Sequence, residues 1–162
     1  MPNYSAVFVN QPNFSLGEVK VIYKYKFKIS DCPKITDAED VVSICFDCNI
    51  LDKELLGLKE QFIIFYLNNS NKIISHEKHS IGGISMAIVD PSTIMLTAAK
   101  LRACGVILVH THPSGNTKAS KSDIDITHKI SSALEHINVN VLDHIIITPD
   151  RSYLSFKEEV II

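Results

Sequence analysis

Residues 106–123 read Val106-Ile-Leu-Val-His110-Thr-His112-Pro-Ser-Gly-Asn-Thr-Lys-Ala-Ser120-Lys-Ser-Asp123. The apolar run at the start of this stretch predicts a buried strand. The two histidines at its end stand two residues apart, so their rings project from the same side of the chain. The proline that follows restricts the second histidine to extended conformations, and Pro-Ser-Gly-Asn is strong turn chemistry. The turn is therefore expected to fold the chain back over the histidines and to return Asp123 toward them.

Two imidazoles and one carboxylate that converge in this way predict a metal site. His110, His112 and Asp123 form a three-ligand set for a borderline cation such as Zn²⁺, and the fourth tetrahedral position is left for water. That arrangement is typical of catalytic rather than structural zinc. The alternative is that Ser120-x-x-Asp123 is only a helix capping box and that the histidines are solvated at a strand end. We favour the metal site, because convergent ligand types are what a site needs and packing does not.

The same residues resemble a known family of proteins. His110-Thr-His112-Pro followed by Ser120-x-x-Asp123 resembles the JAMM (MPN+) metallopeptidase motif. The longer reading His-Thr-His-Pro-Ser-Gly-Asn is similar to the JAB domain of the RadC family. The resemblance runs from about Glu18 to the C-terminus. It implies an α/β fold in which a mixed β-sheet is sandwiched between helices, the three-layer architecture of JAB/MPN and cytidine-deaminase-like proteins.

Downstream residues strengthen the likeness to RadC proteins, and two positions depart from it. Asp143-His144-Ile-Ile-Ile-Thr and Tyr153-Leu-Ser-Phe belong to the RadC-like pattern. Thr111 stands where RadC members usually have Asn, and Ala119 where they usually have Pro. Neither position supplies a metal ligand, so the site itself is unaffected. The Asp-His pair precedes an apolar strand, where we expect it to have a structural role or to support the ligands rather than to be catalytic.

Peptide hydrolysis at a zinc site needs more than the metal. Zinc lowers the pKa of its bound water to about 7, but a general base must take the proton and a donor must stabilise the developing oxyanion. In JAMM enzymes the base is a Glu at the start of an upstream strand, and Glu60 matches it by resemblance. Glu54 and Glu77 are its competitors. Ser120 matches the serine that stabilises the tetrahedral intermediate; alternatively it is only a helix N-cap.

Composition places the chain among ordinary soluble globular proteins. It has 162 residues, 46% of them hydrophobic and 21% charged, which predicts one domain with a substantial core. The formal net charge of −2 argues against broad binding of nucleic acid. No membrane-spanning run or export signal is visible, so we expect a cytoplasmic protein that does not bind membranes. The four cysteines are expected to be free thiols.

The order of patterns along the chain predicts one domain behind a short arm. Residues 1–17 are polar and are expected to form an irregular N-terminal arm, and residues 18–162 a single RadC-like JAB/MPN domain. A strand is predicted from Val19 to Ile29, where apolar and lysine residues alternate. The segment His76-Glu77-Lys78-His79 lacks the spacing of a zinc helix and is expected at the surface. Further on, strands alternate with helices that open after Thr36, Asp90 and Ser120.

Three functions are compatible with these residues. The favoured one is a hydrolase with one catalytic Zn²⁺, a JAMM-type metallopeptidase or isopeptidase that acts on a peptide or protein substrate. The second is a non-enzymatic accessory module in DNA repair, suggested by the RadC likeness. Full-length RadC proteins carry an N-terminal helix-hairpin-helix segment, for which we expect this chain to have no room. That expectation weakens the case for a DNA-repair module. The third, a metal-dependent nuclease, needs a basic channel, for which Lys118, Lys121 and Lys129 are a thin basis.

Overall fold

A computed structural model describes most of the chain. The described residues are 6–9, 18–21, 28–82 and 89–162. They fall into two compact units, Met1–Cys32 and Pro33–Ile162. The predicted division into an arm of residues 1–17 and a domain of residues 18–162 stays a prediction.

The first unit contains a two-stranded antiparallel sheet. Strand β1 (Ala6–Val9) pairs with β2 (Glu18–Val21), and a short 3-10 helix, η1 (Ile29–Asp31), follows. The strand predicted from Val19 to Ile29 is thus observed only at its start. Residues 22–27 of that prediction lie outside the described residues. Its last residue, Ile29, begins η1 and is not extended.

The second unit is built on a five-stranded mixed sheet. Its strands are β3 (Glu60–Leu67), β4 (Ile73–Gly82), β5 (Gly105–Thr111), β6 (Asn140–Ile147) and β7 (Tyr153–Ser155). They lie in the order β4-β3-β5-β6-β7, and only the β5–β6 pair is parallel. The histidine-bearing strand β5 is therefore the central strand of the sheet, as its uniformly apolar sequence predicted.

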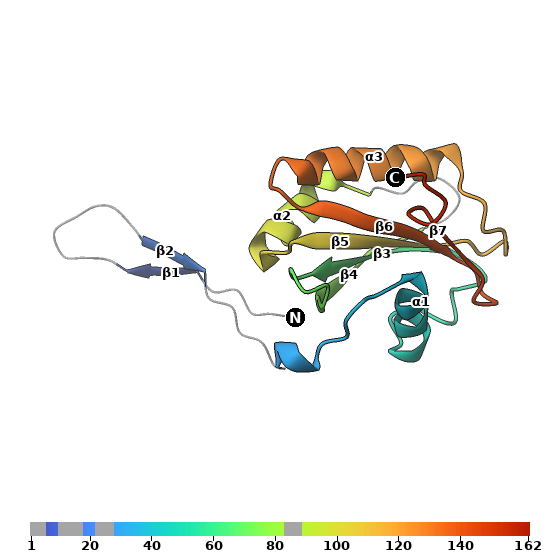
Figure 1. Ribbon diagram of the computed structural model, residues 1–162, viewed down its shortest axis with the longest axis horizontal. Helices are drawn as coiled ribbons and strands as arrows, with labels where there is room; N and C mark the ends of the chain where they lie inside the picture. The colour runs from blue at the N-terminus through green and yellow to red at the C-terminus, as the bar shows by residue number, and fades with distance from the viewer. Residues whose placement is uncertain (1–5, 10–17, 22–27, 83–88) are drawn as a thin grey trace. The chain divides into compact units, whose positions relative to one another are not determined.

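Three helices cover this sheet on its two faces (Figure 1). Helix α1 (Ala38–Asp47) packs on one face, and α2 (Pro91–Leu101) and α3 (Lys121–Glu135) pack on the other. Side chains of β5 alternate between the two cores, with Ile107 and Val109 toward α1 and with Val106 and Leu108 toward α2 and α3. The prediction of a mixed sheet between helices is confirmed.

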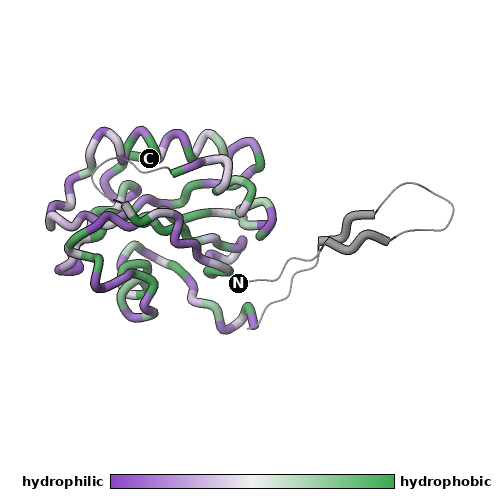
Figure 2. The backbone as a smooth tube through the Cα atoms, turned by 180° about the vertical axis from the view of Figure 1, so that it is seen from behind, coloured by the Kyte–Doolittle hydropathy of each residue, from purple (hydrophilic) through white to green (hydrophobic). Residues whose placement is uncertain are grey.

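Each of the helices α1, α2 and α3 begins at a side chain that accepts a backbone N–H. Asp90 caps α2 by accepting from the N–H groups of Ser92 and Thr93, and Pro91 occupies the first turn. Helix α1 is capped by Asp37, one residue later than the predicted Thr36. The described helices are amphipathic, and α3 alternates between hydrophilic and hydrophobic residues along its length (Figure 2). None of the helices in the described residues is long and apolar enough to cross a membrane.

Candidate metal centre

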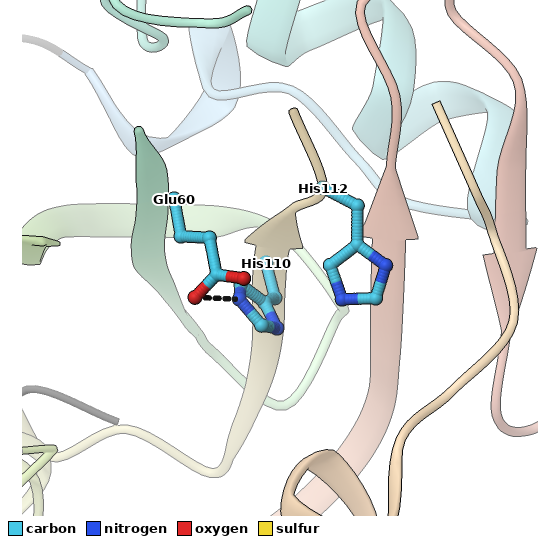
Figure 3. Close-up of side chains that lie close together, drawn as sticks. All are labelled: Glu60, His110 and His112. Atoms are coloured by element: carbon cyan, nitrogen blue, oxygen red, sulfur yellow. Dashed lines mark ion pairs between the residues drawn. The ribbon is translucent and has the colours of Figure 1, made fainter. Parts of the chain in front are cut away.

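The candidate site lies where β5 ends, on the sheet face that α2 and α3 cover. Glu60, His110 and His112 each offer one ligand atom, and these atoms all lie within 4.8 Å of one another. Figure 3 shows the Glu60 carboxylate of β3 beside the His110 ring of β5, with His112 just beyond the end of that strand. The β3–β5 ladder brings the two strands together here, because it pairs Phe62 with His110.

The turn after the histidines has the predicted form. Gly115 adopts φ +78°, which suits glycine, and its N–H donates to the carbonyl of His112 at 3.2 Å. The Nδ1–H of His112 donates to the carbonyl of Asn116 at 2.7 Å. A carbonyl can only accept, so Nδ1 carries the proton and the other nitrogen, Nε2, keeps its lone pair when the ring is neutral. The turn thus prepares His112 as an Nε2 ligand.

Asp123 reaches the histidines from the first turn of α3. Its Oδ2 accepts the N–H of Ser120 at 2.8 Å and the hydroxyl of Ser120 at 2.6 Å, and that hydroxyl accepts the Asp123 N–H at 3.2 Å. This is a reciprocal capping box, and it fixes the carboxylate. Oδ1 lies 3.1 Å from Nδ1 of His110, and Oδ2 lies 3.5 Å from Nε2 of His112. The capping box therefore holds the Asp123 carboxylate beside both histidines, and the use of these three residues as metal ligands stays a prediction.

His110 stands between two carboxylates. Its Nε2 lies 3.5 Å from the Glu60 carboxylate, opposite the side on which Nδ1 approaches Asp123. Burial alone lowers the pKa of His110, but the two carboxylates outweigh it and raise that pKa to about 9. Asp123 shows the complementary effect: burial raises its pKa, but the two neighbouring histidines and the hydrogen bonds from Ser120 hold it well below its ordinary value. Protons on the histidines thus balance the carboxylates here.

The residues fit a divalent cation. Nδ1 of His110 is buried and, despite its closeness to Asp123, makes no well-aligned hydrogen bond. Such an orphaned buried nitrogen costs free energy unless it meets a partner. Two imidazoles and a fixed carboxylate are the donor set that zinc takes at catalytic sites. A cation would also neutralise the carboxylates in place of the imidazole protons.

Two carboxylates compete for the third ligand position. The Asp123 side chain is 5% exposed, and its carboxylate accepts two hydrogen bonds from Ser120. The Glu60 side chain is 34% exposed and forms an ion pair with His110. A ligand profits from a fixed position, and a base must reach both solvent and substrate. The geometry suits the predicted roles of Asp123 as ligand and Glu60 as base, and those roles stay predictions.

The competitors of Glu60 lie elsewhere. Glu54 is exposed in the segment before β3. Glu77 accepts from the Tyr66 hydroxyl at 2.9 Å and lies 3.0 Å from Nδ1 of His79. The His79 side chain is only 5% exposed, and its Nε2 accepts the N–H of Asp90 at the start of α2. The prediction that this histidine lies at the surface is wrong, because α2 begins against it.

The Asp143-His144 pair supports the fold around the site. Asp143 accepts the hydroxyl of Ser155 at 2.6 Å and the N–H of His144 at 2.7 Å. His144 is fully buried, and its Nδ1 lies 2.6 Å from the Thr127 hydroxyl, which also donates to the Asp123 carbonyl. Burial lowers the pKa of His144 to about 3. Through Thr127, the neutral ring thus links β6 to the turn of α3 that carries Asp123. The role of Thr127 in this contact was not predicted from the sequence.

Replacing Ser120 by Ala is expected to lower the free energy of unfolding of the metal-free protein by about 1 kcal/mol, because the N-terminus of α3 loses its cap. Ser120→Thr should keep the cap and most of the stability. Urea denaturation of the two variants beside the wild type measures the difference. An Ala variant as stable as the wild type would show that the cap contributes nothing.

The stability of the metal-free protein is expected to fall between pH 6.5 and about 9 because of His110. Its pKa is near 6.5 when unfolded and about 9 when folded, so the stabilisation is complete below pH 6.5 and is lost as the pH rises through 9. The loss is on the order of 3 kcal/mol. Urea melts across this range should show a smaller fall for His110→Gln. If the free energy of unfolding fell equally with pH in the wild type and in His110→Gln, the ion pairs of His110 with the two carboxylates would be contradicted.

Fold and site together define an α/β domain of the JAB type. The family model of the RadC-like JAB domain matches residues 35–161. The chain is 45% identical over 128 residues to a UPF0758 protein of Flavobacterium johnsoniae, which covers 78% of this chain and 52% of that protein. It is 41% identical over 153 residues to a UPF0758 protein of Fusobacterium nucleatum, with 91% and 63% covered. The chain belongs to the RadC-like JAB domain family. It spans between about half and just under two thirds of these relatives' length.

Proposed function

We propose that this protein is a zinc-dependent hydrolase, a JAMM-type peptidase or isopeptidase that cleaves an amide bond in a peptide or protein. The observation that carries the proposal is the convergence of two histidines and two carboxylates at the end of the central strand. One carboxylate is fixed and the other is partly exposed. Metal-assisted hydrolysis needs both kinds, a fixed carboxylate to bind the metal and an accessible one to act as general base. Membership in the JAB family supports the same reaction class.

Each residue has one role in this proposal. His110, His112 and Asp123 would hold the ion, which when bound supplies a Lewis acid and a water that ionises near neutral pH. Glu60 is the proton carrier: it accepts a proton from the attacking water and returns it to the leaving nitrogen. The interaction with His110 holds the pKa of Glu60 below its ordinary value, so its carboxylate is ionised and ready to accept at neutral pH.

Ser120 is the proposed donor to the oxyanion that develops on the substrate carbonyl. Its single hydroxyl hydrogen points at Oδ2 of Asp123 in this structure. To act on substrate, that hydrogen must turn from the carboxylate to the carbonyl oxygen. The Ser120 N–H would keep Asp123 in place meanwhile, because it bonds the same oxygen at 2.8 Å. The cap and the oxyanion donor are then two states of one side chain.

The test is hydrolysis that depends on zinc. Metal-free protein, prepared with a chelator, is incubated with one equivalent of Zn²⁺ and two libraries of quenched fluorescent peptides, one linear and one branched through a lysine isopeptide bond. We expect cleavage of members of at least one library, its loss on chelation and its return with zinc. Protein that binds zinc and cleaves neither library, yet binds duplex DNA in a salt-dependent way, would overturn the proposal in favour of a DNA-binding module.

A further inference from the structure

The ladder between β3 and β5 ends two residues away from the proposed base. Its register runs from Leu67 opposite Gly105 to Phe62 opposite His110, and no ladder pair to β5 follows at Gln61 or Glu60. Both residues still pair with β4 on their other side, but a strand segment that is paired on one side only opens more readily than one that is paired on both sides. The Glu60 side chain therefore starts from the part of β3 that the ladder to β5 does not hold.

A side-chain hydrogen bond replaces the missing ladder bond at this place. The backbone N–H of Gln61 donates to the hydroxyl of Thr111 at 2.8 Å, across 50 residues of sequence. Thr111 stands between the two histidines and is fully buried. Its hydroxyl does not face the metal site, because neighbouring residues of a strand point to opposite faces of the sheet. The residue between the two proposed ligands is thus bonded to the residue next to the proposed base.

The Gln61 side chain secures the other flank of Glu60. Its Oε1 accepts the N–H of Asp52, and its Nε2 donates to the carbonyl of Asp52, both at 2.8 Å. This amide is 1% exposed, and both of its polar atoms are satisfied. It ties the start of β3 to the loop that leads into it. Gln61 can do so without entering the site, since its side chain points away from that of Glu60.

We propose that Thr111 and Gln61 are positioning residues that hold Glu60 at its place beside His110. The proposal rests on the proposed function, because it assigns Glu60 the role of base. The proposed ligand His110 lies on β5 and the Glu60 carboxylate on β3, so their separation depends on how the two strands are bonded at this level. The Thr111 hydroxyl makes the bond between the strands there. A displacement of about 1 Å at a catalytic group can slow a reaction about a hundredfold.

The test uses Thr111→Ala and Thr111→Ser, a matched pair that differs only in the hydroxyl. Cobalt(II) replaces zinc, and pseudocontact shifts in the NMR spectrum report where the Glu60 and Gln61 nuclei lie relative to the ion. In Thr111→Ala we expect the pseudocontact shifts of the Glu60 and Gln61 nuclei to change. The pseudocontact shifts of α3 nuclei should stay at their wild-type values. Amide hydrogen exchange at Gln61 should rise about tenfold. The cobalt dissociation constant should stay within about threefold of the wild-type value, and Thr111→Ser should match the wild type throughout.

A second variant and a rate measurement separate positioning from folding. Gln61→Met removes both bonds to Asp52 and should displace Glu60 in the same assay, even if Thr111→Ala fails to fold. With any library peptide that the wild type cleaves, Thr111→Ala should lower kcat about tenfold to a hundredfold. The same substitution should add no further loss when Glu60 is already Gln.

The outcomes that overturn this inference differ from those that overturn the function. Unchanged pseudocontact shifts in both Thr111→Ala and Gln61→Met would show that these residues do not position Glu60. A wild-type protein that binds no cobalt would overturn the proposed function instead. In that case amide hydrogen exchange at Gln61, compared between the metal-free wild type and metal-free Thr111→Ala, still decides whether Thr111 holds the start of β3.

Discussion

We expect Glu60→Gln to lower the rate of the proposed zinc-dependent hydrolysis by about 10²- to 10⁴-fold, the share that a positioned general base typically contributes. The amide has nearly the shape of the carboxylate but cannot take up the proton of the attacking water. Zinc content should stay at the wild-type level, because the proposed ligands are His110, His112 and Asp123. The measurement is the initial rate on a cleaved library peptide beside the zinc content of the same preparation.

Glu54→Gln is the control for this prediction. It makes the same chemical change at an exposed carboxylate before β3 and should leave both quantities unchanged. Loss of zinc from Glu60→Gln would show instead that Glu60 is a ligand, in line with its place among the three clustered ligand atoms. Wild-type activity in Glu60→Gln would require a different base.

Asp123→Ala is expected to weaken zinc binding more than about a hundredfold. Losing a residue that only hydrogen-bonds to a ligand weakens metal binding up to about a hundredfold, and losing the ligand itself should weaken it more. The reason is that Asp123 supplies the carboxylate oxygen nearest to His110, at 3.1 Å. Competition against a chromophoric zinc chelator measures the affinity. Asp125→Ala, at an exposed carboxylate of the same helix, should bind like the wild type.

Asp123 also caps α3, so loss of the fold must be separated from loss of a ligand. Asp123→Asn keeps an oxygen that can accept the Ser120 N–H, but it removes the charge that the cation needs. We expect this variant to be folded and still weak in zinc binding. Equal zinc affinity in Asp123→Asn, Asp123→Ala and the wild type would exclude Asp123 as a ligand.

The sequence predicted the parts of the site that depend on local spacing. The positions of His110 and His112 follow from the two-residue period of a strand, and the return of Asp123 follows from a short turn and a helix cap. Such patterns lie within a few residues of one another, so they can be recognised without knowing the fold. The mixed sheet between helices was predictable from the alternation of strand and helix patterns together with the family resemblance.

The contacts that hold the site together were not predictable in this way. Gln61 and Thr111 are 50 residues apart, and Thr127 and His144 are 17 apart, so each pair forms only once the strands and α3 are assembled. A threonine or glutamine in a strand carries no local sign of its partner. The burial of His79 likewise depends on where α2 begins. Buried polar residues in these strands were the one available signal, because each must find a hydrogen bond.

The most direct test is a crystal structure of the zinc-loaded protein with anomalous diffraction measured at the zinc absorption edge. We predict one peak at the end of β5, about 2.0–2.2 Å from a nitrogen of His110, a nitrogen of His112 and an oxygen of Asp123. The Glu60 carboxylate should lie near the ion without ligating it. A peak bonded to Glu60 in place of Asp123, or no peak at these residues, would contradict the account.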